Sequence, residues 1–229
     1  MSAGPNPPTR SVTISLAPGR VALLLVIGIL ALAAANVLAG FYQVFTGADV
    51  PTLIDVSEEC NIPTWYNSAL LALAGGLAAL VGRADRGREG ARPKYWWGMA
   101  LAMFLVSMDE VAAVHERIDA LVPPRLVEPF GEWITVHPWV IFGLPAVLLL
   151  GALYVPFLRA LPDRTRRFFL LAAAAYVGGA IGAESLHGAI NVYYGGGVFT
   201  SLAILLEESL EMTGVVIFIY GLLDHLRRI

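Results

Sequence analysis

Apolar residues dominate the chain in long runs that are separated by short polar segments. Six of these runs are about 20 residues long, the length that an α-helix needs to cross the hydrocarbon core of a bilayer. We therefore expect an all-α integral membrane protein, built as a bundle of six transmembrane helices. The expected spans are Val21–Phe45, Trp65–Val81, Tyr95–Ile118, Trp139–Leu158, Phe168–Tyr193 and Val198–Leu223.

The first apolar run lies close to the N-terminus, where a signal peptide would also lie. Its length of about 25 residues exceeds the roughly 7–15 apolar residues of a signal peptide, so we interpret it as a retained helix. Residues 1–18 precede it and are expected to form a disordered cytoplasmic tail. Residues 19–229 then form a single transmembrane domain.

The basic residues alternate with the expected spans and so predict their orientation. Cytoplasmic loops of membrane proteins carry an excess of Lys and Arg. If the N-terminus is cytoplasmic, only Arg117 and Arg125 of the 15 Lys and Arg residues fall on the outer side. We therefore expect both termini in the cytoplasm. The short loops favour a bacterial inner membrane.

The composition agrees with a membrane protein and excludes other classes. Hydrophobic residues make up 57% of the chain and charged residues 14%, with a mean hydropathy of +0.69, whereas a soluble domain has roughly 25% charged residues. The net charge is −3 and there is no basic block, which argues against nucleic-acid binding. The single cysteine, Cys60, excludes an intrachain disulfide and a cysteine-based zinc or iron–sulfur site.

Three of the expected spans carry acids and histidines among their apolar residues. Charged groups inside a membrane are costly, and a functional site is their usual explanation. The spans hold almost no Lys or Arg, so the acids must be neutralised by protons or by a bound cation. Carboxylates combined with imidazoles suit Fe, Mn or Zn. The candidate metal ligands are Asp109, His115, Glu116, Glu184, His187, Glu208 and Glu211.

The positions of these residues predict one shared site. Counted from the outer ends of the spans, the acids of all three helices fall mostly in the outer half of the bilayer. Glu184 and His187 lie about 60° apart on one helix face. Asp109 and Glu116 are about 10.5 Å apart along a helix axis, which favours two metal ions over one. The neighbouring acids Glu110 and Glu207 are the expected catalytic groups, which shuttle protons.

This ligand set is similar to that of the di-iron and di-manganese carboxylate bundles. Those bundles use four carboxylates and two histidines, with a Glu-x-x-His on each of two helices. Glu184-x-x-His187 matches that element, but a second copy is absent, because His115 precedes Glu116 and the last span carries Glu208-x-x-Glu211. The similarity implies a carboxylate-bridged centre with Fe or Mn.

We therefore expect a metalloenzyme that acts on a lipid or another apolar molecule, as an oxidoreductase or a metal-dependent hydrolase. A divalent-cation or proton-coupled transporter would use the same acids. A haem held by His115 and His187 and a structural subunit without chemistry are further alternatives.

Several residues near the outer ends of the spans have no firm assignment. Glu58 and Glu59 fit either solvated acids at a helix start or a funnel that gathers ions. Cys60 has no catalytic signature. His137, just before the fourth span, is interpreted as an interface residue, and His225 as unrelated to the site.

Overall fold

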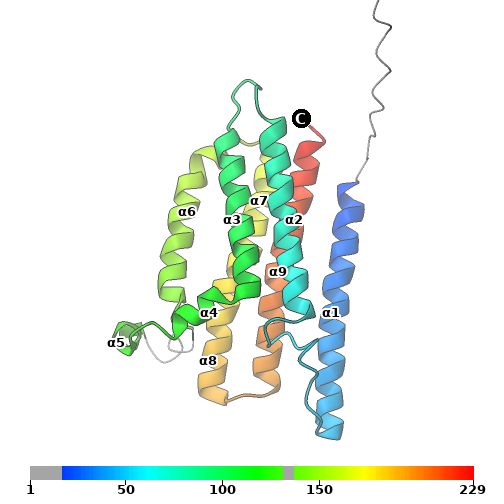
Figure 1. Ribbon diagram of the computed structural model, residues 1–229, viewed down its shortest axis with the longest axis vertical. Helices are drawn as coiled ribbons and strands as arrows, with labels where there is room; N and C mark the ends of the chain where they lie inside the picture. Colours follow the sequence, from blue (N-terminus) through cyan, green and yellow to red (C-terminus); the bar gives the residue numbers. More distant parts are fainter. Residues whose placement is uncertain (1–16, 131–136) are drawn as a thin grey trace, which may run out of the picture.

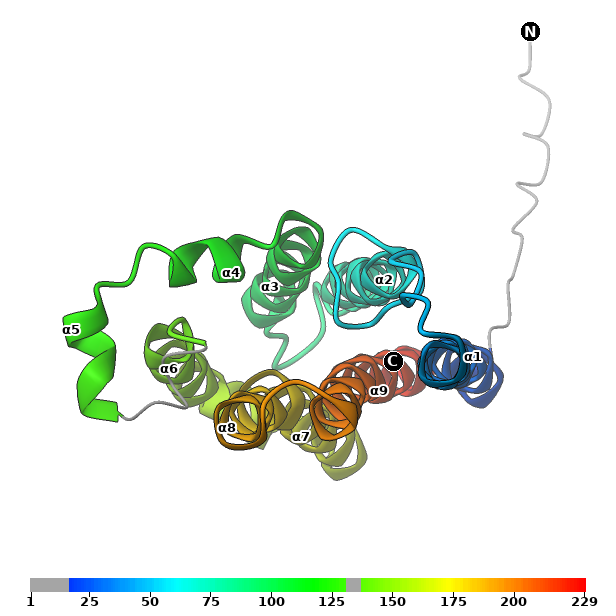
Figure 2. The same ribbon diagram turned by 90° about the horizontal axis from the view of Figure 1, so that it is seen from below.

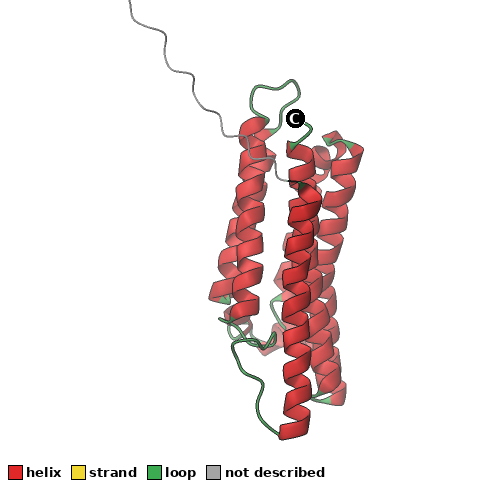
Figure 3. Cartoon of the chain, turned by 90° about the vertical axis from the view of Figure 1, so that its right-hand side faces the viewer, coloured by secondary structure: helices red, strands yellow, loops and turns green. Residues whose placement is uncertain are grey.

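The computed structural model describes residues 17–130 and 137–229. Within these ranges the chain is all-helical and contains no strand. The long helices pack side by side as an elongated bundle (Figures 1 and 3). The elements are α1 (Pro18–Thr46), α2 (Ile62–Ala84), α3 (Pro93–Ala112), α4 (Val114–Asp119), α5 (Pro124–Val127), η1 (Glu128–Phe130), α6 (Val140–Ala160), α7 (Asp163–Val177), η3 (Gly178–Ala183), α8 (Glu184–Tyr194) and α9 (Val198–Leu226).

Local sequence signals mark the ends of the first helices. Proline occupies the first turn of α1, α2 and α3, where its missing N–H removes no intrahelical bond. The Asn61 side chain accepts a hydrogen bond from the backbone N–H of Thr64 (3.1 Å) and caps α2. Of the expected tail, only Ala17 and Pro18 are described, and Pro18 already belongs to α1.

In the described part of the chain, four helical segments are long and apolar enough to cross a membrane. They are α1, α2, α6 and the continuous stretch Asp163–Tyr194, which α7, η3 and α8 form together. Large apolar side chains of α1 and α6, such as Leu24 and Leu148, are exposed, as on surfaces that face lipid. Acidic residues lower the hydropathy of α3 and α9, so length and composition do not single out these two helices as spans.

Seen along its axis, the bundle has two rows of helices (Figure 2). Helices α2 and α3 form one row and pack along each other. Helices α6, α8 and α9 belong to the second row, and α1 lies at its end against α9. The start of α1 and the C-terminus lie at the same end of the bundle (Figure 1).

The largest aromatic core lies at the end of the bundle that holds the C-terminus. Trp96, near the start of α3, is 1% exposed. Its ring meets Phe157 of α6 edge-on, with centroids 4.9 Å apart, and Phe169 of α7 at 5.9 Å. Ile219 and Leu222 of α9 are completely buried in the same cluster. This apolar half holds the helices together, so the other half can accommodate polar groups.

Two of the expected spans are irregular. The predicted continuous helix Tyr95–Ile118 is wrong, because Ala113 adopts the left-handed conformation (φ 46°) and the chain turns from α3 into α4. The expected helix Phe168–Tyr193 is helical throughout, but Gly178–Ala183 form a π-helical segment, η3. Such segments are frequent at functional sites. Both irregularities lie beside acidic residues.

Candidate functional site

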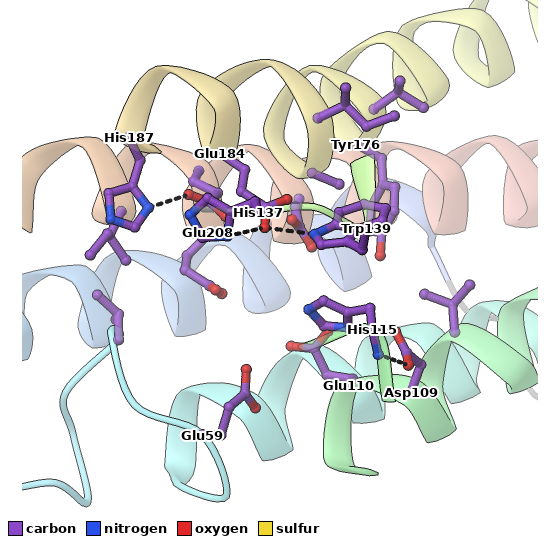
Figure 4. Close-up of a pocket in the computed structure, with 18 of the residues that line it drawn as sticks. Glu59, Asp109, Glu110, His115, His137, Trp139, Tyr176, Glu184, His187 and Glu208 are labelled. Atoms are coloured by element: carbon purple, nitrogen blue, oxygen red, sulfur yellow. Dashed lines mark hydrogen bonds and ion pairs between the residues drawn. The ribbon is translucent and has the colours of Figure 1, made fainter. Parts of the chain in front are cut away.

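A cavity of about 290 Å³ lies between α3, α6, η3, α8 and α9, and ten carboxylate and imidazole side chains line it. The described lining residues include no Lys or Arg. The ten are Glu59, Asp109, Glu110, His115, His137, Glu184, His187, Glu207, Glu208 and Glu211. The labelled groups come from two facing walls (Figure 4).

Glu184, the first residue of α8, holds the centre of one wall. Its side chain is only 8% exposed. Its Oε1 atom accepts a hydrogen bond from Nε1 of Trp139 (2.8 Å) and pairs with Nδ1 of His137 (2.9 Å). Glu184 directly follows the π-helical segment. Its two contacts place it against the residues at the start of α6.

The contact with Glu184 changes the protonation behaviour of His137. Burial by itself lowers the pKa of His137, but the hydrogen bond to Glu184 and the negative charges of Glu184, Glu207 and Asp119 together outweigh it, so the pKa is raised above its ordinary value. The other ring nitrogen, Nε2, is buried and has no hydrogen-bond partner. Unpaired buried polar atoms are uncommon and often indicate an ion or ligand.

His187 lies one turn after Glu184 on α8, as its spacing predicts. Its Nδ1 atom is 3.6 Å from Oε2 of Glu207 on α9. The rings of His137 and His187 are neighbours, with centroids 5.3 Å apart. Two imidazoles and two carboxylates therefore lie together on this wall.

Gly179 sets how closely η3 approaches α9. A Cβ atom at this position would lie 2.9 Å from the carbonyl oxygen of Glu207 and 2.9 Å from Cγ of Glu211. Real Cβ atoms do not approach that closely, so only glycine permits this contact. The contact holds the acids of α9 against the wall formed by η3 and α8.

The opposite wall is built around the turn at Ala113. The turn brings His115 back to Asp109: Nδ1 of His115 lies 2.8 Å from Oδ2 of Asp109, and the backbone N–H of His115 donates to Oδ1 (3.1 Å). Beside this pair, the completely buried Asn67 of α2 donates a hydrogen bond to Oε1 of Glu110 (3.0 Å). The backbone N–H of Trp139 also donates to the Asp119 carboxylate and ties α4 to α6.

The three histidines of the cavity share one arrangement. In each case Nδ1 faces a carboxylate, in the pairs His115–Asp109, His137–Glu184 and His187–Glu207. A carboxylate on one imidazole nitrogen fixes the ring and its tautomer, and it is the usual partner of a histidine that binds metal through the other nitrogen. Within the described ranges, no three His, Cys, Asp or Glu residues are grouped so that they could hold a metal ion.

Eight of the nine residues singled out in the sequence line this cavity. The ninth, Glu116, belongs to α4, and its side chain lies outside the described part of the structure. The interpretation of His137 as an interface residue missed its place in the cavity. The signal for it was its position just before an expected span, at the same expected depth as the acids.

Other lining residues also escaped the sequence reasoning. Trp139 and Tyr176 line the cavity. Glu59, from the loop before α2, lines it as well, and it belongs to the pair of acids for which a funnel was one of the two interpretations. His225 lies at the other end of the bundle and contacts Thr165 (3.1 Å), so it is separate from this group. Aromatic residues in apolar helices carry no pattern that separates a cavity wall from ordinary packing.

Comparison with known proteins gives one match. A family with the description "Domain of unknown function (DUF8692)" matches residues 23–226, a range that runs from α1 into the last turn of α9. No curated protein and no solved structure matches the chain. A functional assignment therefore depends on the cavity itself.

Proposed function

The chain belongs to the DUF8692 family, whose description gives no function, so we propose one from the cavity. We propose that the protein is a membrane-embedded metalloenzyme that acts on a lipid or another apolar molecule. Its chemistry is that of an oxidoreductase or a metal-dependent hydrolase.

One observation carries the proposal: three histidine–carboxylate pairs and four further carboxylates line one cavity, and no described lining residue is Lys or Arg. So many carboxylates in a partly enclosed space must be neutralised by protons or cations. Mixed carboxylate and imidazole donors suit Fe, Mn or Zn. The unpartnered Nε2 atom of His137 provides a further donor for a cation.

The proposed ligands are those expected from the sequence, with His137 added. Glu110 and Glu207 move protons beside them. Two ions of iron or manganese would serve oxygen chemistry, whereas zinc would lower the pKa of a bound water for hydrolysis. The proposed ligands are Asp109, His115, Glu116, His137, Glu184, His187, Glu208 and Glu211.

The apolar part of the cavity supports an apolar substrate. Val106, Val147, Val177 and Ile204 line it from α3, α6, α7 and α9. Its volume of about 290 Å³ is at the small end of ligand pockets, which span roughly 300–1,000 Å³. It is therefore matched to a lipid head group or a short apolar segment rather than to a whole lipid.

We further propose six transmembrane helices, with α3 and α9 as spans, in a bacterial inner membrane. The basic residues support cytoplasmic termini, and the cavity then lies toward the outer side. Cys60, the single cysteine, is exposed. Its reaction with a reagent outside the cell tests this orientation. A membrane-impermeant maleimide should label it in cells with an intact inner membrane.

A matched variant controls the labelling. The double variant Cys60→Ser, Glu89→Cys moves the thiol to the exposed loop between α2 and α3 and should be labelled only after permeabilisation. Labelling of this variant but not of the wild type in intact cells would reverse the proposed orientation.

The metal is tested by elemental analysis of the purified protein after exposure to iron, manganese or zinc and removal of free ions. We expect retained metal in the wild type and in Glu128→Gln, an exposed control. We expect its loss in Glu184→Gln combined with His187→Ala, with circular dichroism to confirm folding. Wild-type protein without metal would overturn the proposal. Weak binding together with cation flux into vesicles would instead favour a transporter.

A further inference from the structure

A second cavity, of about 400 Å³, lies between α1, α9 and the loop that joins α1 to α2. The loop that joins α1 to α2 lies at the end of the bundle opposite the C-terminus (Figure 1). The lining of the second cavity is polar for a position beside a lipid-facing helix, with carboxylates of Asp49, Asp55 and Glu58 and the hydroxyl groups of Thr52 and Ser201. The described lining includes no Lys or Arg.

Helix α1 contributes a polar stripe to this second cavity. Asn36, Gly40 and Gln43 line it, and these positions fall within about 60° of one another around the helix. Asn36 and Gln43 are the two amide side chains of α1, whose other residues are mostly apolar. Gly40 leaves open space, because a Cβ atom there would meet nothing within 4 Å.

The wall formed by the α1–α2 loop is held in place by one side chain. Nδ2 of Asn61, which is 5% exposed, donates to the carbonyl oxygens of Thr52 (3.1 Å) and Glu58 (2.6 Å). The same residue caps α2 through Thr64. The loop is therefore fixed to the bundle, and the cavity behind it is part of the folded structure.

The two cavities adjoin each other. Val56, Ser57 and Ile204 line both of them. A cation that moves from the second cavity to the first passes from three lining carboxylates to seven, with no described basic side chain on the way. Clefts lined by one sign of charge concentrate counter-ions and raise their rate of association.

We propose that the second cavity is the access route by which hydrated divalent cations reach the histidine–carboxylate cavity from the outer side. This inference rests on the proposed metal binding.

The route is tested by the rate at which chelator-stripped protein takes up Mn²⁺, followed by stopped-flow with a free-metal indicator. At Gly40 an added Cβ meets nothing within 4 Å, so Gly40→Leu begins in open space beside the cavity and favours the helix. It should narrow the route and slow uptake several-fold, at unchanged final occupancy. Gly151→Leu on α6, another site with open space, should take up Mn²⁺ at the wild-type rate.

A charge variant tests the same route independently. Asp49→Asn combined with Glu58→Gln should slow uptake and weaken its dependence on ionic strength, whereas Glu128→Gln should not. Wild-type rates in both Gly40→Leu and the charge variant would overturn the route and leave the metal site standing. No uptake by the wild type would overturn the metal site and the route together.

Discussion

His137 and Glu184 form a 2.9 Å ion pair between the residues that precede α6 and the first residue of α8. The same carboxylate oxygen accepts the indole N–H of Trp139. One buried carboxylate thereby joins the start of α6 to the helix that follows the π-helical segment. This junction therefore fixes the start of α6 at one side of the cavity.

Replacing Glu184 should destabilise the metal-free protein. Glu184→Ala leaves the donors of His137 and Trp139 unpaired, and each buried unpaired group costs about 1–3 kcal/mol. Glu184→Gln keeps an acceptor and should lose less. Thermal unfolding in detergent, followed by tryptophan fluorescence, measures both variants. A Glu184→Ala protein as stable as the wild type would show that the junction does not hold α6.

Gly179 and Gly178 are adjacent but should respond differently to a methyl group. Gly179→Ala places Cβ within 2.9 Å of α9 backbone, whereas Cβ at Gly178 meets nothing within 4 Å. We expect Gly179→Ala to cost about 1–3 kcal/mol through overpacking and Gly178→Ala to be nearly neutral. Denaturant unfolding of the two variants provides the comparison, and equal losses would contradict the close contact.

Because Ala113 is in the left-handed conformation, the stability of the protein should depend on which residue occupies this position. Left-handed backbone costs a non-glycine residue about 1–2 kcal/mol. Ala113→Gly removes this cost but adds unfolded-state entropy, so its stability should match or exceed that of the wild type. Ala113→Val should be less stable, because a β-branched residue is disfavoured there. A stable Ala113→Val protein would argue for a continuous α3–α4 helix.

At the other end of the bundle, we expect His225 to make the stability of the protein depend on pH. Burial lowers the pKa of His225 below its ordinary value, so the unfolded chain binds the proton more readily than the folded protein. Its stabilising contribution is therefore complete above a pH of about 6.5 and is lost as the pH falls below that value. Unfolding midpoints at several pH values should fall less steeply for His225→Gln than for the wild type, and parallel curves would contradict this assignment.

The apolar pattern predicted most of the helices, because long apolar runs admit few other structures in a membrane. Helix α2 begins within a few residues of the expected Trp65. The left-handed Ala113 and the π-helical segment were not predictable, since no glycine marks the first and the second depends on packing against α9. Both are tertiary effects that local sequence does not specify.

For the candidate site, the sequence indicated the residues but not their partners. Depth and helix-face arguments selected Glu184 and His187 because periodicity determines which residues share a face. The pairing of His137 with Glu184 depends on where the loop before α6 returns to the bundle. Asn67 escaped notice for a similar reason, since an amide in an apolar helix has many possible roles.

The π-helical segment also fixes the angular register of everything that follows it. A π-turn holds one residue more than an α-turn, so it takes up one residue without turning the helix that follows. If the same residues of Gly178–Ala183 wound as an ordinary α-helix, Glu184 and His187 would be rotated by about 100° relative to α7. The π-turn therefore keeps the acid and the histidine on the cavity side of a helix whose composition would be the same without it.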